Sequence, residues 1–163
     1  MHEQHPQNLP WLDRLTAHIP GYGGYQVRGH RRAAERALRD AIATRLDRLK
    51  IHIDESIRSC VDRGALTEIN ALERLQRHMG RLAERVRAAG SGTDHFYSTE
   101  ELSADKANPI YALDLVLFEK ADTVARVFDG FDSSHDRLAH VEECLNDIGK
   151  TLDERALLIQ GIR

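Results

Sequence analysis

The feature that most constrains the fold is a nearly uniformly apolar run between residues 108 and 130. It reads N-P-I-Y-A-L-D-L-V-L-F-E-K-A-D-T-V-A-R-V-F-D-G. Asn108 suits the capping position before a helix, Pro109 suits the first helical position and Gly130 suits a stop. A helix that is apolar nearly all round must be covered on most sides. We therefore expect the rest of the chain to supply that cover.

Three other segments have the apolar spacing of helices. Apolar residues recur at steps of three and four in residues 26–63, 67–89 and 134–162, which is the helix period and not the strand period. Gly64 makes the link between the first two segments short, so these two helices are predicted to form an antiparallel pair. The last segment follows a heptad, with Arg155 at its one polar seam position.

The N-terminal part of the chain has a different pattern. Residues 9–18 can form a short amphipathic helix, and a proline and three glycines in residues 19–25 then break it. Near residue 98, a Ser-Thr-Glu-Glu sequence predicts the start of another short helix. The predicted fold is all-α: an antiparallel bundle of three to four long helices over residues 26–163, preceded by an arm and Gly/Tyr hinge at residues 1–25.

The net charge of −3 hides an asymmetry along the chain. Residues 27–90 carry 15 Arg and Lys against 9 Asp and Glu, whereas residues 91–163 carry 7 against 15. Basic helices packed beside acidic ones would explain this, and an anionic partner for the basic half is the alternative. The most basic point is a patch at the start of the long helix. Because cations there oppose the helix dipole, we expect an acidic neighbour. The patch comprises Arg28, His30, Arg31 and Arg32.

Asp114 interrupts the apolar run. On a helix it shares a face with large apolar residues, and a buried carboxylate needs a charged or hydrogen-bonding partner. One interpretation is a functional site in the bundle core. The favoured interpretation is a structural ion pair with an arginine of the basic half, or exposure along a narrow polar strip.

A metal site is the alternative use of the polar residues. Helix bundles hold metals through Glu-x-x-His pairs, and this chain has only the reversed spacing, in two places. Exposed side chains explain these pairs more simply. The candidate metal ligands are His52, Glu55, Asp114, Glu119, His140 and Glu143.

Other chemical signatures are missing from the sequence. It contains no nucleophile elbow, phosphate-binding loop or dinucleotide fingerprint. Cys60 and Cys144 match no metal or redox spacing. We therefore expect no cofactor. Without a signal peptide or an apolar run near 18 residues, we expect a cytoplasmic location and no transmembrane segment.

The sequence thus favours a non-enzymatic protein that binds a protein partner or itself. Heptad-like seams motivate this hypothesis, because such seams pair with other helices. A metal-holding bundle enzyme is the main rival, and nucleic-acid binding through the basic half is third. The N-terminal arm is the candidate docking element, although packing of Trp11 in the chain's own core is the favoured interpretation. Its candidate partner-binding residues are Trp11, Leu12, Leu15, Tyr22 and Tyr25.

Overall fold

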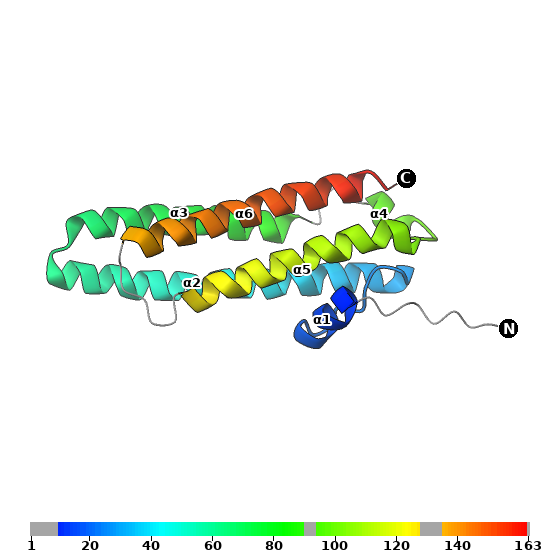
Figure 1. The fold of residues 1–163 in the computed structure, drawn as a ribbon, viewed down its shortest axis with the longest axis horizontal. Helices are drawn as coiled ribbons and strands as arrows, with labels where there is room; N and C mark the ends of the chain where they lie inside the picture. Colours follow the sequence, from blue (N-terminus) through cyan, green and yellow to red (C-terminus); the bar gives the residue numbers. More distant parts are fainter. Residues whose placement is uncertain (1–9, 90–93, 128–134, 163) are drawn as a thin grey trace.

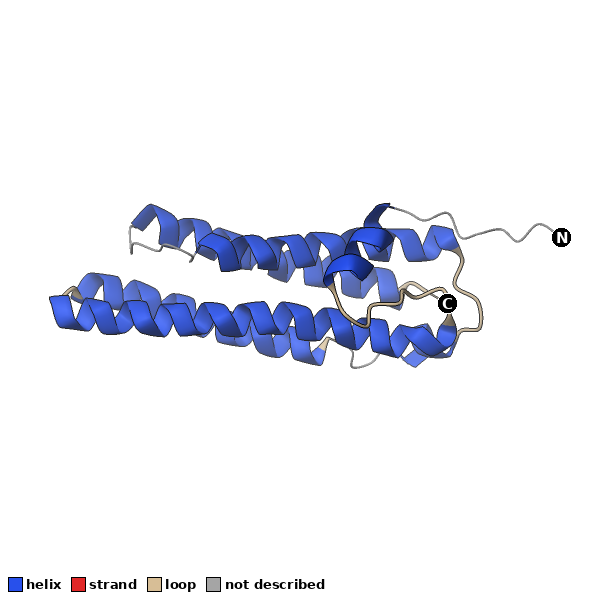
Figure 2. Cartoon of the chain, turned by 90° about the horizontal axis from the view of Figure 1, so that it is seen from below, coloured by secondary structure: helices blue, strands red, loops and turns tan. Residues whose placement is uncertain are grey.

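The computed structural model describes residues 10–89, 94–127 and 135–162, and all regular secondary structure within them is helical (Figure 2). The all-α bundle predicted from the sequence is confirmed. No helix in these ranges is long and apolar enough to cross a membrane. The elements are α1 (Pro10–His18), the 3-10 turn η1 (Arg28–His30), α2 (Arg31–Arg63), α3 (Leu66–Ala88), α4 (Asp94–Ser98), α5 (Ala104–Val127) and α6 (His135–Gln160).

The four long helices form two hairpins that lie side by side (Figure 1). In each hairpin, α2 with α3 and α5 with α6, the helices are antiparallel (Figure 1), as the short link at Gly64 predicted for the first pair. Between the hairpins, α2 packs on α5 and α3 packs on α6. These pairs run parallel: His78 contacts Glu142, and further along both helices Arg85 contacts Asp153. The small helix α1 lies against α5.

Gly64 ends α2 as the sequence predicted. Its φ is +68°, in the left-handed region that favours glycine. The amide of Gly64 donates to the carbonyl of Val61 at 3.1 Å, and the amide of Ala65 donates to that of Cys60 at 2.9 Å. These bonds satisfy carbonyls at the end of α2, and α3 begins at Leu66.

The apolar helix α5 begins earlier than predicted. It starts at Ala104, so Asn108 is not its cap and Pro109 lies inside it. The carbonyl of Ser103 accepts hydrogen bonds from the amides of Lys106 and Ala107, and Asp105 places a negative charge in the first turn. The hydrogen bonds and the acidic first turn at Ser103 favour a helix start there more strongly than the capping preference of Asn108 favours a later one. The predicted stop at Gly130 lies outside the described residues.

The short helix α4 also differs from the prediction. It spans Asp94–Ser98 and ends where the sequence pattern suggested a start. Phe96 and Tyr97 are buried, and the ring of Phe96 packs edge-on against Tyr25 at 5.3 Å. Burial of these two rings decides the position of the helix, in preference to the capping pattern at residues 98–101.

The N-terminal segment belongs to the same hydrophobic core as the long helices. Leu15, Ile19, Tyr22 and Tyr25 are each 2% exposed or less. Three neighbours, α1, α2 and α6, therefore cover α5. With only two neighbours, α5 would leave apolar surface uncovered, which would be a reason to expect self-association. The third neighbour removes that reason.

Ion pairs connect the basic and acidic halves of the chain. Arg45 on α2 faces Asp122 on α5 at 3.4 Å, and Arg85 on α3 faces Asp153 on α6 at 2.6 Å. Packing within the fold thus accounts for part of the charge asymmetry.

Burial of the N-terminal segment leads to a first prediction. Leu15→Ala should lower the free energy of unfolding by about 2–5 kcal/mol, because it removes a fully buried side chain and leaves a cavity. Leu66→Ala is the matched control: Leu66 is 72% exposed, so its truncation should change stability by no more than about 0.5 kcal/mol. Urea unfolding measures both. Equal losses for the two variants would show that α1 is not part of the core.

Candidate functional site: a buried arginine–carboxylate–tyrosine cluster

Arg155 lies at the centre of a polar cluster inside the bundle. Its side chain projects from α6 and is only 4% exposed. Nε donates to Oδ1 of Asp114 on α5 at 2.5 Å. Nη1 donates to Oε1 of Glu35 on α2 at 3.2 Å, and Nη2 donates to Oε2 of the same carboxylate. One guanidinium therefore binds two buried carboxylates and connects three of the four long helices.

The Gly/Tyr loop completes the cluster. Oδ2 of Asp114 accepts hydrogen bonds from the hydroxyls of Tyr22, at 2.6 Å, and Tyr25. The Tyr25 hydroxyl also accepts from Nη2 of Arg155 at 3.0 Å. The backbone amide of Tyr25 donates to the hydroxyl of Tyr111 on α5 at 2.6 Å. The loop is thus held by polar contacts as well as by burial of its rings.

The backbone of the loop depends on Gly24. Its φ is +82°, and a Cβ built there would lie 2.8 Å from the hydroxyl oxygen of Tyr111 and 3.3 Å from Cδ1 of Leu12. Any larger residue would combine an unfavourable backbone conformation with a steric clash. Glycine therefore permits the close approach that lets the Tyr25 amide reach Tyr111.

A second buried arginine ties the loop to α4. Arg31, at the start of α2, is 0% exposed. Its Nε donates to the carbonyl of Tyr25 at 2.6 Å, and its Nη1 donates to the carbonyls of Phe96 at 3.0 Å and Thr99 at 2.6 Å. Arg31 therefore joins two segments that are about 70 residues apart in the sequence.

The charges of the central cluster balance. Asp114 and Glu35 carry two negative charges and Arg155 carries one positive charge. Arg39 supplies the second positive charge, since its Nε lies 3.7 Å from Oε1 of Glu35. A buried charge is tolerated when it is paired and hydrogen-bonded, and both carboxylates meet that condition.

The tyrosines and the arginine of this cluster hold their protons firmly. Burial, and then the charge of Asp114, raises the pKa of Tyr22 and of Tyr25 far above 10. Burial alone would lower the pKa of Arg155, but Asp114, Tyr25 and Glu35 raise it well above its usual value. The tyrosines therefore stay neutral and the arginine stays charged. The hydrogen bonds of the cluster fix the positions of the elements that it joins.

Asp114 is thus in a structural ion pair, as the favoured interpretation held, but its partner was predicted wrongly. The arginine is Arg155 of the acidic half, not one of the basic half. Sequence reasoning missed Glu35 and Tyr111. A signal for Glu35 was present, because Arg31, Glu35 and Leu38 continue the apolar seam of α2 at steps of four and three. Charged residues at seam positions of the helices are thus the sequence pattern that indicates the cluster.

The candidate metal ligands do not converge. Among the described residues, no group of three or more His, Cys, Asp or Glu side chains could hold a metal ion. His52 and Glu55 form an exposed pair, with Nδ1 and Oε2 3.8 Å apart, and His140 lies beside Cys144. Glu119 pairs with an arginine of α1 in a surface groove of about 370 Å³. Glu143 is exposed on α6 and Asp114 lies in the cluster.

The candidate partner-binding residues lie mainly inside the molecule. Leu15, Tyr22 and Tyr25 are buried and Leu12 is half-buried, so these side chains contact the chain's own core. Trp11 is 37% exposed. The described part of the arm, residues 10–25, thus docks on its own bundle, and Trp11 is the only one of the five candidate side chains that is exposed.

The basic patch is also divided by the fold. Arg31 is buried and is not part of any surface patch. Arg28, His30 and Arg32 are exposed. His30 lies near Gly23, on the loop side of the helix start, whereas Arg28 and Arg32 line a separate pocket near α4.

Comparison with known proteins gives no further guide to this site. No protein-family model, curated protein or solved structure matches the chain.

The cluster leads to a prediction about Arg155. Arg155→Met should lower the free energy of unfolding by about 3–5 kcal/mol, because it leaves two buried carboxylates without their shared cation. A triple variant, Glu35→Gln with Asp114→Asn and Arg155→Met, should lose less. It removes the unpaired charges and leaves an amide carbonyl to accept from the tyrosines. Urea unfolding at pH 7 provides the comparison.

Arg74→Met is the control for this experiment, because Arg74 is an exposed arginine of α3. Its stability should stay close to that of the native protein. If Arg155→Met costs no more than Arg74→Met, the cluster does not hold the bundle together.

The tyrosines provide a prediction about alkaline pH. Tyr22, Tyr25 and Tyr111 all have raised pKa values, chiefly through burial, whereas unfolded tyrosine ionises near pH 10. Because the folded-state pKa is the higher one, the stability these groups contribute is complete below pH 10 and declines as the pH rises above it. After a jump to pH 11.5, their tyrosinate absorbance near 295 nm should appear only as the protein unfolds.

Tyr22→Phe should remove about a third of the slow absorbance change that these three tyrosines contribute, since it removes one of their three hydroxyls. Ionisation of all tyrosines within the mixing time, with the helical circular dichroism intact, would contradict the buried cluster.

Proposed function

We propose that this protein is a non-enzymatic helical bundle that works through protein–protein contact made by the tip of the α2–α3 hairpin. The observation that carries the proposal is the exposure of two large aliphatic side chains there. Val61 is 60% exposed and Leu66 is 72% exposed, on the two sides of the Gly64 turn. Half-buried Ile57 and Ile69 connect them to the core.

The shape of the molecule supports a contact at this place. The hairpin extends past the described ends of α5 and α6, so its tip projects from the bundle (Figure 1). Apolar side chains at a projecting end are accessible to another molecule, and apolar contact area is the main source of association free energy.

Other features of the sequence give the proposal less support. The apolar seams of α3 and α6 are buried within the bundle, so they pair with helices of the same chain. The separated His and Glu residues do not favour the metal-enzyme alternative. Nucleic-acid binding is less favoured because Arg31, one of the candidate basic residues, is buried and is not on the surface. We place the protein–protein contact in the cytoplasm, the location that the sequence favours.

The test is a pair of matched double variants. Val61→Ser with Leu66→Ser should abolish association with the partner or with a second copy, while the melting temperature changes by only a few degrees. Ile51→Ser with Leu157→Ser is the control, because these aliphatic side chains are similarly exposed, at 58% and 69%, on other surfaces. Sedimentation velocity measures self-association, and it should report the same state for the control as for the native chain.

A photo-crosslinking amino acid identifies the contact directly. Placed at position 66 and irradiated in the host cell, it should give a defined cross-linked product, and placed at position 157 it should not. A product containing only this chain would indicate self-association, and a second protein would indicate a partner. No product at position 66, together with a monomer in sedimentation, would show that the tip is not a contact surface.

A further inference from the structure

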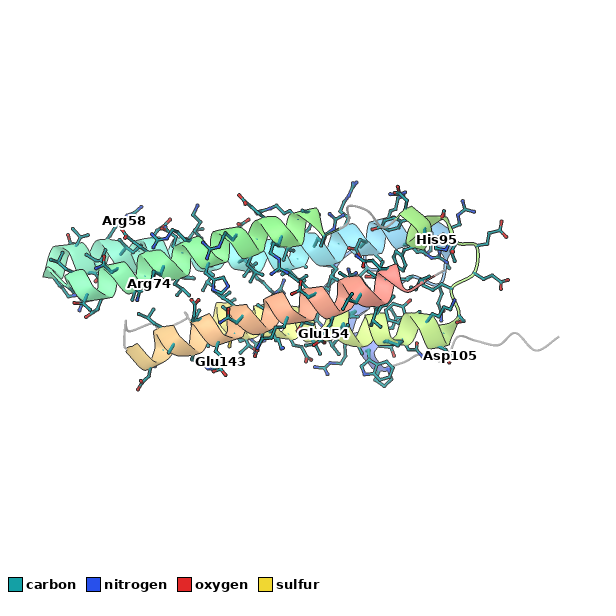
Figure 3. All side chains as sticks on the ribbon, turned by 90° about the horizontal axis from the view of Figure 1, so that it is seen from above. Arg58, Arg74, His95, Asp105, Glu143 and Glu154 are labelled. Atoms are coloured by element: carbon teal, nitrogen blue, oxygen red, sulfur yellow. The ribbon has the colours of Figure 1, made fainter. Side chains whose placement is uncertain are left out.

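A pocket of about 310 Å³ lies between the start of α2 and α4, lined by Arg28, Gly29, Arg32, Tyr97 and Ser98. It is at the opposite end of the bundle from the hairpin tip: in Figure 3, His95 on α4 marks the pocket's end, and Arg58 and Arg74 mark the tip. Its location makes it independent of the contact proposed above.

The pocket has positive charge without a balancing carboxylate. None of its lining residues is acidic. Within residues 10–89, 94–127 and 135–162, neither Arg28 nor Arg32 is paired with a carboxylate. The sequence predicted an acidic neighbour for these cations, and the described part of the chain does not supply it. Other basic residues of the bundle, such as Arg45 and Arg85, do have such a partner.

Arg32 is held in an orientation suited to binding an anion. Its guanidinium carbon lies 4.3 Å from the centre of the Tyr97 ring. A cation–π contact of this kind does not use the N–H hydrogen bonds of the guanidinium group, so they can still bind an anion. Tyr97 is buried, which limits movement of the platform. Because the ring contact already restricts the side chain of Arg32, binding a ligand costs little further side-chain entropy.

Arg31 increases the positive charge beside the pocket. Its guanidinium binds the carbonyls of Phe96 and Thr99, the residues on either side of Tyr97 and Ser98, and its Nη2 is buried without an acceptor. Burial, followed by repulsion from Arg28, lowers the pKa of Arg31. The first turn of α2 contains no acidic residue and no side-chain cap. Among the described residues, none places a carboxylate against these three arginines.

We propose that this pocket binds the phosphate group of a phosphorylated small molecule or lipid headgroup, with Arg28 and Arg32 donating to its oxygens. Guanidinium groups match phosphate oxygens in paired hydrogen bonds, and two of them can neutralise a phosphate dianion. The pocket volume is at the lower end of the range for small-molecule sites, which suits a phosphate with a small attached group.

Isothermal titration calorimetry with inorganic phosphate and with pyrophosphate tests the site on the full chain. Amide shifts of Gly29 and Ser98 in ¹⁵N spectra report where the anion binds. Co-sedimentation with vesicles of phosphatidylcholine containing phosphatidic acid tests the lipid source, with pure phosphatidylcholine as its blank. Binding to the anions without binding to the vesicles assigns a free phosphorylated ligand, and binding to both assigns a headgroup.

Arg28→Ala with Arg32→Ala should weaken phosphate or pyrophosphate binding at least roughly tenfold, because it removes both charge-assisted donors. Arg58→Ala with Arg74→Ala is the matched control, since it removes two exposed arginines at the other end of the molecule and changes the net charge equally. Its affinity should equal that of the native chain. Circular dichroism confirms that each variant is folded.

Several results would overturn the proposal. One is equal weakening in the two double variants, which would show only a general effect of charge. Another is the absence of binding by the native chain to phosphate, pyrophosphate and the acidic vesicles. Finally, Arg28→Lys with Arg32→Lys keeps the charge but not the paired donors, so native affinity in that variant would exclude the proposed geometry.

Discussion

The bonds from Arg155 to Asp114 and Glu35 set the relative positions of the helices. Apolar seams allow neighbouring helices to slide by a turn at moderate cost, because one aliphatic side chain resembles another. A buried guanidinium prevents such sliding, because a shift of one turn, about 5.4 Å, would leave charges unpaired in the core. The cluster therefore selects one register for α2, α5 and α6 from those that hydrophobic packing permits.

The same cluster explains why the N-terminal segment is part of the fold. A helix of nine residues such as α1 is marginal on its own in water. Two buried side chains, Leu15 and Ile19, attach it to the core, and the hydroxyls of Tyr22 and Tyr25 fill acceptor positions on Asp114 that would otherwise be unsatisfied. The loop thus completes the polar core, and the core in turn holds the loop.

The sequence predicts the helices well because apolar periodicity reports which face of a helix is buried. It also marks Asp114 and Arg155 as polar residues on apolar seams. Periodicity does not report which helix covers that face, so the pairing of Asp114 with Arg155 could not be derived from it. Glu35 and Arg31 were hidden for another reason: four neighbouring arginines make the start of α2 resemble a solvated helix end. The position of α4 depends on burial of Phe96, a tertiary contact.

Charge balance distinguishes the two arginine-rich sites of this molecule. In the core, two guanidiniums face two carboxylates, and every oxygen of Asp114 has a donor, so the cluster has no capacity for a further ligand. At the start of α2, three guanidiniums lie close together, and the described residues pair none of them with a carboxylate. A cleft lined by charge of one sign attracts ligands of the opposite charge. The carboxylates of the first site are paired within the chain, whereas the described residues leave the guanidiniums of the second site able to pair with an added anion.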